Sequence, residues 1–301
     1  TLAPNAGHLV HMPAHIFMRL GRYSDSYDQN VKAVAADEGY LTTCSAQGIY
    51  PLGYYPHNIH FMVWSAMFEG RSAETLEMAR KVASKIPDHL DEENWDAYEL
   101  FRSQPLYAMV RFGMWDEILA EPQPIERARY MTGIWHYARA LAYLHTDRTG
   151  KAKRELKQVR DMRDSMADEG GRRSGYATML TIATRIVEAE LDAARGKYDP
   201  AIAKLEEAVR LEGTLGYAEP PAWYFPVRHV LGAVLIEAGR PAEAEVIYWD
   251  DLAKNRENGF ALFGLEQSLR AQEKTEEADA IHERFATAWE RADTELTTSR
   301  F

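Results

Sequence analysis

One short turn, repeated along the chain, limits what this sequence can fold into more than any other feature. An apolar run at helical spacing ends at the turn, and an alanine-rich amphipathic run follows it. Glycine suits such a turn because it enters the left-handed conformation that ends a helix at little cost. The turn recurs at Gly21, Gly70, Gly113, Asp147, Gly196, Gly239 and Glu273, where Asp147 and Glu273 mark degenerate copies.

Each turn is expected to join two helices, a helix A before it and a helix B after it. The clearest unit is 186–208, in which Ala201, Leu205 and Ala208 follow Gly196 at helical spacing. Valine and isoleucine are also scattered at helical spacing, so no strand pattern competes. We therefore predict an all-α chain of about seven helix pairs.

The turn sequences resemble those of a known repeat family. Residues 196–201, with Ala208 seven positions further on, resemble a tetratricopeptide repeat, and so do residues 21–23 followed by Ala33 and residues 239–244. The resemblance covers nearly the whole chain and is strongest in the fifth and sixth units. It implies a right-handed α-solenoid in which the A helices lie side by side on a concave surface.

The repeats indicate how the chain is organised. We expect a single solenoid over residues 1–301, with histidine-rich repeats in 1–87 and the remaining repeats in 88–301. The chain opens without methionine, and its first residues resemble the end of a preceding helical unit. We therefore expect it to be the C-terminal part of a longer chain.

Charge and composition exclude several classes of partner. The formal net charge is -11, which disfavours nucleic acid and anionic membrane surfaces, since both attract clustered lysine and arginine. No run of about 18 apolar residues is present, so no membrane insertion is expected. The single cysteine, Cys44, excludes an intrachain disulfide and a multi-thiolate zinc site. Bacterial cytoplasm and periplasm fit this composition equally well.

Half of the ten histidines lie in two short clusters near the start of the chain. His8, His11 and His15 are spaced to share one face of a helix A. His57 and His60 are one turn apart at the start of the next helix A, where Pro56 suits the first turn.

Neighbouring A helices would bring these two clusters together. Imidazole is a common ligand of zinc, copper, iron and nickel, and zinc needs three or four protein ligands. We therefore predict a transition-metal site (Zn, Cu or Fe) whose candidate ligands are His8, His11, His15, His57 and His60. Pro13 should kink the first helix or mark a helix start. A hydrogen-bonded histidine–aromatic core and an anion-binding groove are the alternatives.

Three other residues are candidates for substrate binding. Tyr54 and Tyr55 end an aromatic, glycine-rich insert at 42–56, which could form a lid over the site. Glu99, with Asp96 nearby, supplies a carboxylate on the third predicted helix A. The alternatives are packing between repeats for the tyrosines and a solvated or salt-bridged face for the carboxylates.

A second resemblance concerns the histidines themselves. Residues 11–16, 19–23 and 54–61 resemble a group of bacterial tetratricopeptide-repeat proteins of unassigned function. In that group a further histidine-rich helix lies upstream of the matching stretch. The resemblance implies that this chain holds only part of the histidine set.

Two functional hypotheses follow. The first is a metal-dependent protein, either a hydrolase or an oxidoreductase, whose metal activates water or dioxygen or polarises a carbonyl. The second is a metal-free scaffold whose concave groove binds a small molecule, a peptide or a protein partner. Stoichiometric metal in the purified protein would distinguish the first from the second.

Overall fold

We analysed a computed structural model of the chain, which describes residues 5–44, 50–90 and 92–301. Every regular element in those ranges is helical, as predicted. The elements are α1 (Gly7–His11), α2 (Pro13–Arg19), α3 (Tyr23–Cys44), the π-helix η1 (Tyr50–Tyr54), α4 (Tyr55–Phe68), α5 (Ser72–Ser84), α6 (Glu92–Arg102), α7 (Gln104–Arg111), α8 (Trp115–Ala120), α9 (Arg129–His145), α10 (Thr149–Ala167), α11 (Gly171–Ala193), α12 (Tyr198–Glu212), α13 (Val227–Glu237), α14 (Pro241–Lys254), α15 (Gly259–Arg270) and α16 (Thr275–Ala288).

All seven predicted turns join a helix pair and share one backbone geometry. Each turn residue has a positive φ, including Asp147 at 58° and Glu273 at 61°. At each turn the amide of the next residue donates to a carbonyl five residues back, as at Lys274, whose N lies 3.1 Å from Leu269 O. This is the Schellman motif that ends many helices. The prediction of seven pairs is confirmed, and α2/α3, α4/α5, α7/α8, α9/α10, α11/α12, α13/α14 and α15/α16 are those pairs.

Two of the A helices depart from the simple pattern. Pro13 is the first residue of α2. Of the two outcomes predicted for it, a kink or a helix start, the structure shows the helix start. Met12 between α1 and α2 keeps helical angles (φ -48°, ψ -38°), and the two short helices therefore follow nearly one path. The residues predicted as the third helix A form α6, an additional helix that leads into α7 through Ser103.

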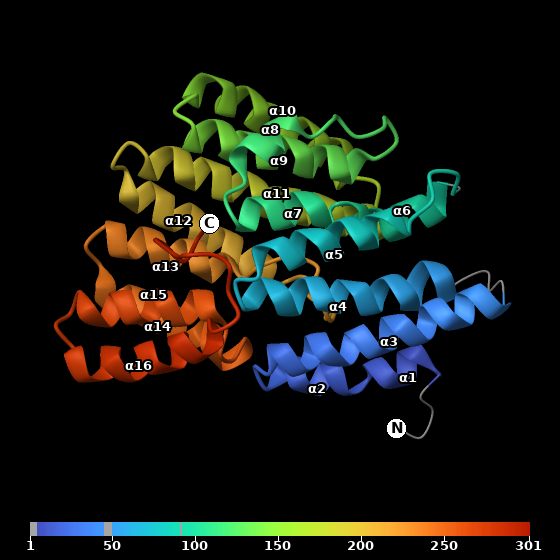
Figure 1. Ribbon diagram of the computed structural model, residues 1–301. Coiled ribbons are helices and arrows are strands. Elements are labelled where there is room, and N and C mark those ends of the chain that lie inside the picture. The colour runs from blue at the N-terminus through green and yellow to red at the C-terminus, as the bar shows by residue number, and fades with distance from the viewer. Residues whose placement is uncertain (1–4, 45–49, 91) are drawn as a thin grey trace.

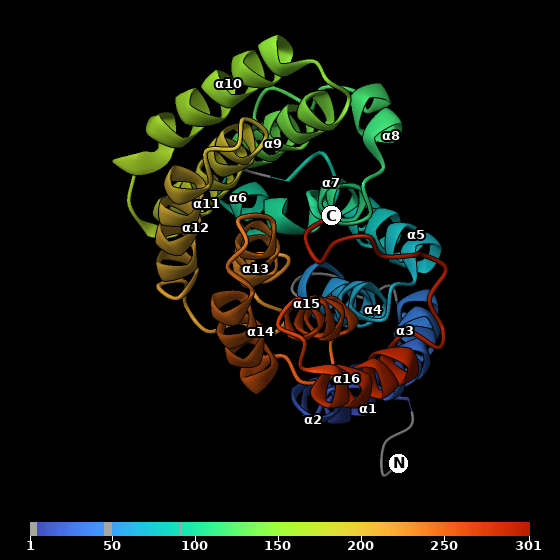
Figure 2. The same ribbon diagram turned by 90° about the vertical axis from the view of Figure 1, so that its left-hand side faces the viewer.

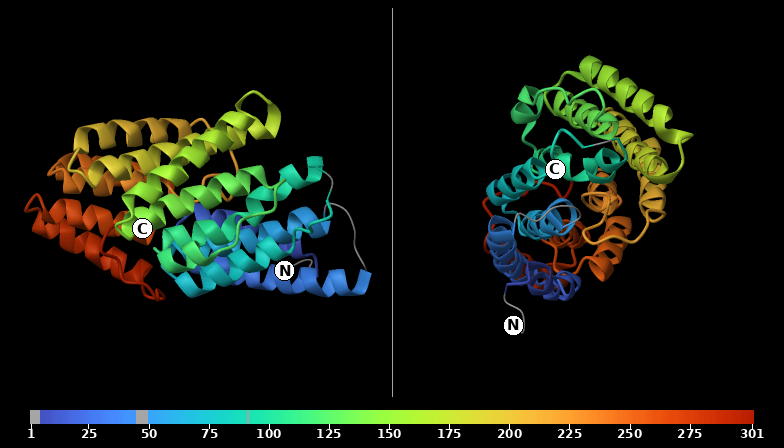
Figure 3. Two further views of the ribbon diagram at one scale, coloured as in Figure 1. Left: turned by 90° about the horizontal axis from the view of Figure 1, so that it is seen from above. Right: turned by 90° about the vertical axis from the view of Figure 1, so that its right-hand side faces the viewer.

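The helix pairs curve into a ring (Figures 1 and 2). The A helices α4, α7, α9, α13 and α15 lie toward its inside and most B helices toward its outside, whereas α1 and α2 lie at the outer edge beside α16. The last unit meets the first, as the further views also show (Figure 3). Tyr23 on α3 donates its hydroxyl to Arg256 O at 2.8 Å. Asp293, which follows α16, accepts from the amides of Ser72 and Ala73 at 2.6 and 3.0 Å. These contacts close the solenoid.

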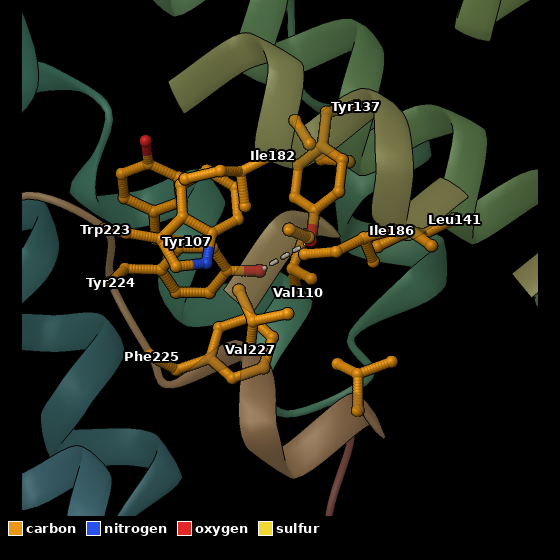
Figure 4. Close-up of a cluster of buried hydrophobic side chains, with 14 of the residues drawn as sticks. Tyr107, Val110, Tyr137, Leu141, Ile182, Ile186, Trp223, Tyr224, Phe225 and Val227 are labelled. Atoms are coloured by element: carbon orange, nitrogen blue, oxygen red, sulfur yellow. Dashed lines mark hydrogen bonds between the residues drawn. The ribbon is translucent and has the colours of Figure 1, made fainter. Parts of the chain in front are cut away.

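The inner face of the ring is covered by the chain itself. Residues 217–226, between α12 and α13, carry Trp223, Tyr224 and Phe225 into the interior, where none is more than 1% exposed. Tyr224 stacks on Tyr107 with ring centroids 4.1 Å apart, and its hydroxyl is 3.0 Å from that of Tyr137 (Figure 4). A substantial part of the predicted concave surface is therefore packed core.

A buried arginine fixes the last residues of the chain inside the ring. Arg111 on α7 is fully buried and donates to the carbonyls of Ser299 and Arg300 at 3.2 and 2.8 Å. Its other terminal nitrogen lies 2.9 Å from His229 Nδ1, and His229 Nε2 lies 2.8 Å from Asp251.

Among the described residues, no helix is long and apolar enough to cross a membrane.

Candidate metal centre

Three of the predicted histidines meet at one point. Nitrogen atoms of His11, His15 and His57 all lie within 4.8 Å of one another. They come from three helices: α1, α2 and α4. The Nε2 atoms of His11 and His15 are 2.9 Å apart, and the ring of His57 has its centroid 4.8 Å from that of His11. This spacing is of the size that a shared metal ion requires.

The local sequence explains why these rings converge. His11 ends α1 and His15 lies in the first turn of α2, and the helical angles of Met12 keep them one turn apart on the same face. Phe61 follows His57 by one turn on α4. Its ring packs edge-on against all three imidazoles, at centroid distances between 4.5 and 5.0 Å. Phe61 thus forms the apolar floor of the cluster.

A side-chain amide orients His11. Asn30 on α3 donates through Nδ2 to Ser26 O at 2.8 Å, which turns its oxygen toward His11 Nδ1 at 2.7 Å. His11 Nδ1 must therefore carry the hydrogen, and its Nε2 is left with a lone pair. A hydrogen bond of this kind at the remote ring nitrogen is typical of metal-binding histidines.

A carboxylate from the far end of the sequence orients His15. Glu219 accepts a hydrogen bond from His15 Nδ1, and its other oxygen accepts from Arg19 Nε at 2.5 Å. Burial acts to raise the pKa of the Glu219 carboxyl, but hydrogen bonds from His15, Tyr217 and Arg19 bring the pKa below its usual value. The ionised carboxylate accepts the Nδ1 hydrogen, so Nε2 is the His15 nitrogen that faces His11.

Burial keeps His11 and His57 neutral. It is the main cause that lowers the pKa of His11 to about 3 and that of His57 to about 3, and the neighbouring histidines lower both further. At neutral pH these two rings are uncharged, which is the form that binds a metal ion. The Nε2 atoms of His11 and His15 lie 2.9 Å apart, a distance at which the two nitrogens share a hydrogen or face a common metal ion.

His8 lies beside the other three histidine rings but is not one of the three whose nitrogens meet. Its ring centroid is 5.5 Å from that of His11 and 6.3 Å from that of His57. Its Nδ1 is buried and has no hydrogen-bond partner among the described residues. Burial is the first cause that lowers the pKa of His8. His8 is therefore a neutral imidazole with an unpaired nitrogen next to the cluster.

His60 lies elsewhere. It packs edge-on against Phe101 with centroids 5.5 Å apart, beside Gln104, and burial lowers its pKa to about 4. Residues three apart on a helix differ by roughly 60° around its axis. On α4, which is buried on nearly all sides, that difference places His60 toward α6 and α7 while His57 faces α1 and α2.

The predicted substrate-binding residues have separate positions. Tyr54 is 40% exposed and packs against His8, with ring centroids 4.4 Å apart. Tyr55 donates its hydroxyl to Glu38 on α3 at 2.8 Å. Glu99 is buried against α9, where it accepts from Met131 N at 2.8 Å, and burial raises its pKa to about 7. Only Tyr54 thus has a contact with the histidines.

The structure describes the predicted lid in part. Residues 45–49 of the insert lie outside the described residues. The described end of the insert forms η1, from which Tyr50 donates its hydroxyl to Asp37 at 2.6 Å. Asp37 also accepts from Asn58 Nδ2 at 2.7 Å, so it links α3 to the start of α4.

The similarity of this chain to known proteins lies in its structure. No family model matches it, and no curated protein matches it. It is similar in structure to a tetratricopeptide repeat protein from Parabacteroides merdae ATCC 43184, with 12% sequence identity, 94% of this chain and 98% of that chain covered, and a TM-score of 0.39. The helix pairs and their shared turns define the fold of this chain, an α-solenoid of helix–turn–helix units.

Proposed function

We propose that this chain binds one transition-metal ion through His11, His15 and His57, with His8 as the fourth candidate ligand. The observation that carries the proposal is the pair of Nε2 atoms 2.9 Å apart. Both rings use Nδ1 as a donor, so both Nε2 atoms face the centre of the cluster, where a metal ion would take the place of a hydrogen shared between them. The nitrogen of His57 within 4.8 Å would complete a three-histidine set.

The donor set limits the metal. Every member of this cluster is an imidazole, and imidazole suits zinc, copper and iron. Such an ion, when bound, acts as a Lewis acid or lowers the pKa of a bound water, which is the basis of hydrolase chemistry. Copper or iron would also supply the electron transfer that an oxidoreductase needs. Asn30 and Glu219 would hold the ligand rings in their orientation, and Phe61 would exclude water from one side. We therefore favour a metal-dependent enzyme.

The alternative of a metal-free scaffold with a peptide in its concave groove has less support. Residues 217–226 and the last residues of the chain already pack against the inner helices. A peptide would have to displace the buried Trp223, Tyr224 and Phe225.

Metal content measured by mass spectrometry on the untagged protein tests the proposal. We expect about one equivalent of a single transition metal, and its loss in the His15→Ala and His57→Ala variants. His89→Ala is the matched control, since His89 is exposed and outside the cluster. If the protein takes up no metal on titration, or if folded His15→Ala and His57→Ala variants keep it, the proposal is wrong.

A further inference from the structure

The segment after α16 leaves the helix layer and enters the ring. Its first part is fixed by Asp293, which accepts from the amides of Ser72 and Ala73. Figure 2 shows the segment, in red, running from α16 past the start of α5 and turning inward near α7 and α13. Residues 291–301 form no helix, and Ser299 is only 2% exposed. The segment therefore reaches the inside of the ring without being part of a helix pair.

The main chain and the serine of this segment are both hydrogen-bonded inside the ring. Arg111 on α7 is fully buried, and one of its terminal nitrogens donates to the carbonyls of Ser299 and Arg300 at 3.2 and 2.8 Å. Ser299 Oγ donates to His229 O at 2.8 Å and lies 2.7 Å from the hydroxyl of Tyr248. Every peptide has carbonyls, so Arg111 would hold a segment of any sequence, whereas the contacts of Ser299 favour a small hydroxyl side chain.

The arginine of the segment meets two carboxylates. The guanidinium of Arg300 donates to Glu190 on α11 at 3.2 Å and to Glu237 on α13 at 2.5 Å. Glu190 is 4% exposed, so burial raises the pKa of its carboxyl, and Arg300 acts against that rise. A buried carboxylate without a cation beside it is costly, and the planar guanidinium can reach two carboxylates at once. The interior therefore favours arginine at this position.

Aromatic rings surround the next residue of the segment. The ring of Phe301 stands edge-on to Trp115 and to His145, at centroid distances of 6.0 and 5.7 Å. Trp115 and His145 are stacked on each other with centroids 4.6 Å apart, and Phe225 lies 6.1 Å from Phe301. Three consecutive side chains of the segment thus have three chemically different sets of partners.

The segment is packed more loosely than a core. An open space of about 330 Å³ is lined both by residues 294–298 and by Phe112, Trp115 and His145. Glu295 and Thr297 are exposed. Because protein interiors are close-packed, a space of this size is typical of a binding site and not of a core.

These contacts have the form of a peptide in a recognition site. We infer that the interior between α7, α9, α11 and α13 binds a Ser-Arg-aromatic segment of a partner protein, and that residues 299–301 fill this site as a tethered competitor. The partner would replace these three residues, and residues 217–226 would stay in place. A tethered segment holds its site at an effective concentration on the order of 1 mM, so a partner has to compete with it. The inference does not depend on the metal centre.

Fluorescence anisotropy with a labelled peptide of residues 294–301 tests the inference on the full-length chain. The wild-type chain should bind the peptide weakly, because its own segment competes. In Arg300→Glu the tethered segment is repelled by Glu190 and Glu237, so we expect this variant to bind the peptide at least about tenfold more tightly than the wild type does. The same peptide with Arg300→Gln should bind the variant at least about tenfold more weakly, because the charge-assisted pair is lost.

A second variant weakens the tethered segment without placing a new charge in the interior. Phe301→Ala removes only the aromatic contacts, and it should also bind the peptide more tightly than the wild type does. Arg154→Glu is the matched control and should bind like the wild type, since Arg154 is exposed on α10 and outside the site. Absence of saturable binding to both Arg300→Glu and Phe301→Ala, equal binding of the Arg300→Gln peptide, or tighter binding to Arg154→Glu would overturn the inference.

Discussion

His11 and His15 direct their Nε2 atoms at each other across the break between α1 and α2, at 2.9 Å, while the Nδ1 atom of each ring is held by another side chain. Asn30 holds the first ring and Glu219 the second. The two orienting residues come from α3 and from the segment after α12. The geometry of the proposed ligands therefore depends on parts of the chain that are far apart in the sequence.

Removal of an orienting side chain should weaken metal binding without abolishing it. In Glu219→Ala, His15 loses the acceptor at Nδ1, and we expect the affinity for Zn²⁺ to fall by about 10- to 100-fold. Asn30→Ala should act in the same way on His11. Competition titration with a chelating dye measures both, with Glu283→Ala as an exposed control. Affinities equal to that of the control would show that Asn30 and Glu219 do not position ligands.

The stability of the metal-free protein should fall as the pH is lowered from 6.5 toward 3. The pKa of His11 and that of His57 are lowered to about 3 in the folded chain, from an ordinary value of 6.5. Between these values the unfolded chain binds more protons than the folded chain, so the free energy of unfolding decreases with falling pH. Urea unfolding at several pH values measures this, and the His57→Asn variant should show a smaller decrease. A stability that rises on acidification would contradict the burial of neutral rings.

The closure of the ring should be sensitive to a single methyl group. A Cβ at Gly70, which has a φ of 69°, would lie 2.2 Å from the ring of Trp289 after α16. Gly70→Ala should therefore cost more than the ~1–2 kcal/mol of a left-handed alanine alone. Gly196→Ala, with the same φ and open space around it, should cost only that amount.

Gly39 is a control at which replacement of glycine by alanine should raise the stability of the chain instead of lowering it. It lies within α3 with nothing within 4 Å of an added Cβ, so Gly39→Ala should stabilise the chain by up to about 1 kcal/mol. Thermal unfolding of the three variants measures the order. Equal effects of Gly70→Ala and Gly196→Ala would mean that Trp289, after the last helix pair, does not pack on the turn of the second pair in solution.

Arg111 should be a major determinant of stability. In Arg111→Met, the carbonyls of Ser299 and Arg300 and the Nδ1 atom of His229 lose their donor inside the core, so we expect a loss of about 3 kcal/mol or more. Arg154→Met is the control, since Arg154 is exposed, and its effect should stay within about 0.5 kcal/mol. Hydrogen exchange should also show faster exchange at residues 296–301 in Arg111→Met alone. Equal protection of these residues in both variants would argue against the role of Arg111.

The sequence was most informative where the physics is local. Gly196 and even Glu273 adopt the predicted left-handed turn, because the termination of a helix depends on a few adjacent residues. The stripe formed by His8, His11 and His15 follows from helical spacing alone, and its approach to His57 follows from the repeat architecture.

Features that depend on distant contacts could not be predicted. Glu219 reaches His15 across 204 residues, and its only sequence signal was a proline- and aromatic-rich segment. The direction of His60 depends on α4 having neighbours on both sides, which periodicity does not reveal on a helix that is apolar all round. Ring closure likewise depends on Trp289 fitting against Gly70 and Gly259.

X-ray absorption spectroscopy of the zinc-loaded chain tests the central claim most directly, because it reports the ligands of the ion itself. We predict three or four nitrogen ligands at about 2.0–2.1 Å, with the outer-shell scattering of imidazole rings. The triple variant of His11, His15 and His57 to alanine should lose that signal. A spectrum of oxygen ligands alone, or an imidazole signal that persists in the folded triple variant, would contradict the proposed metal centre.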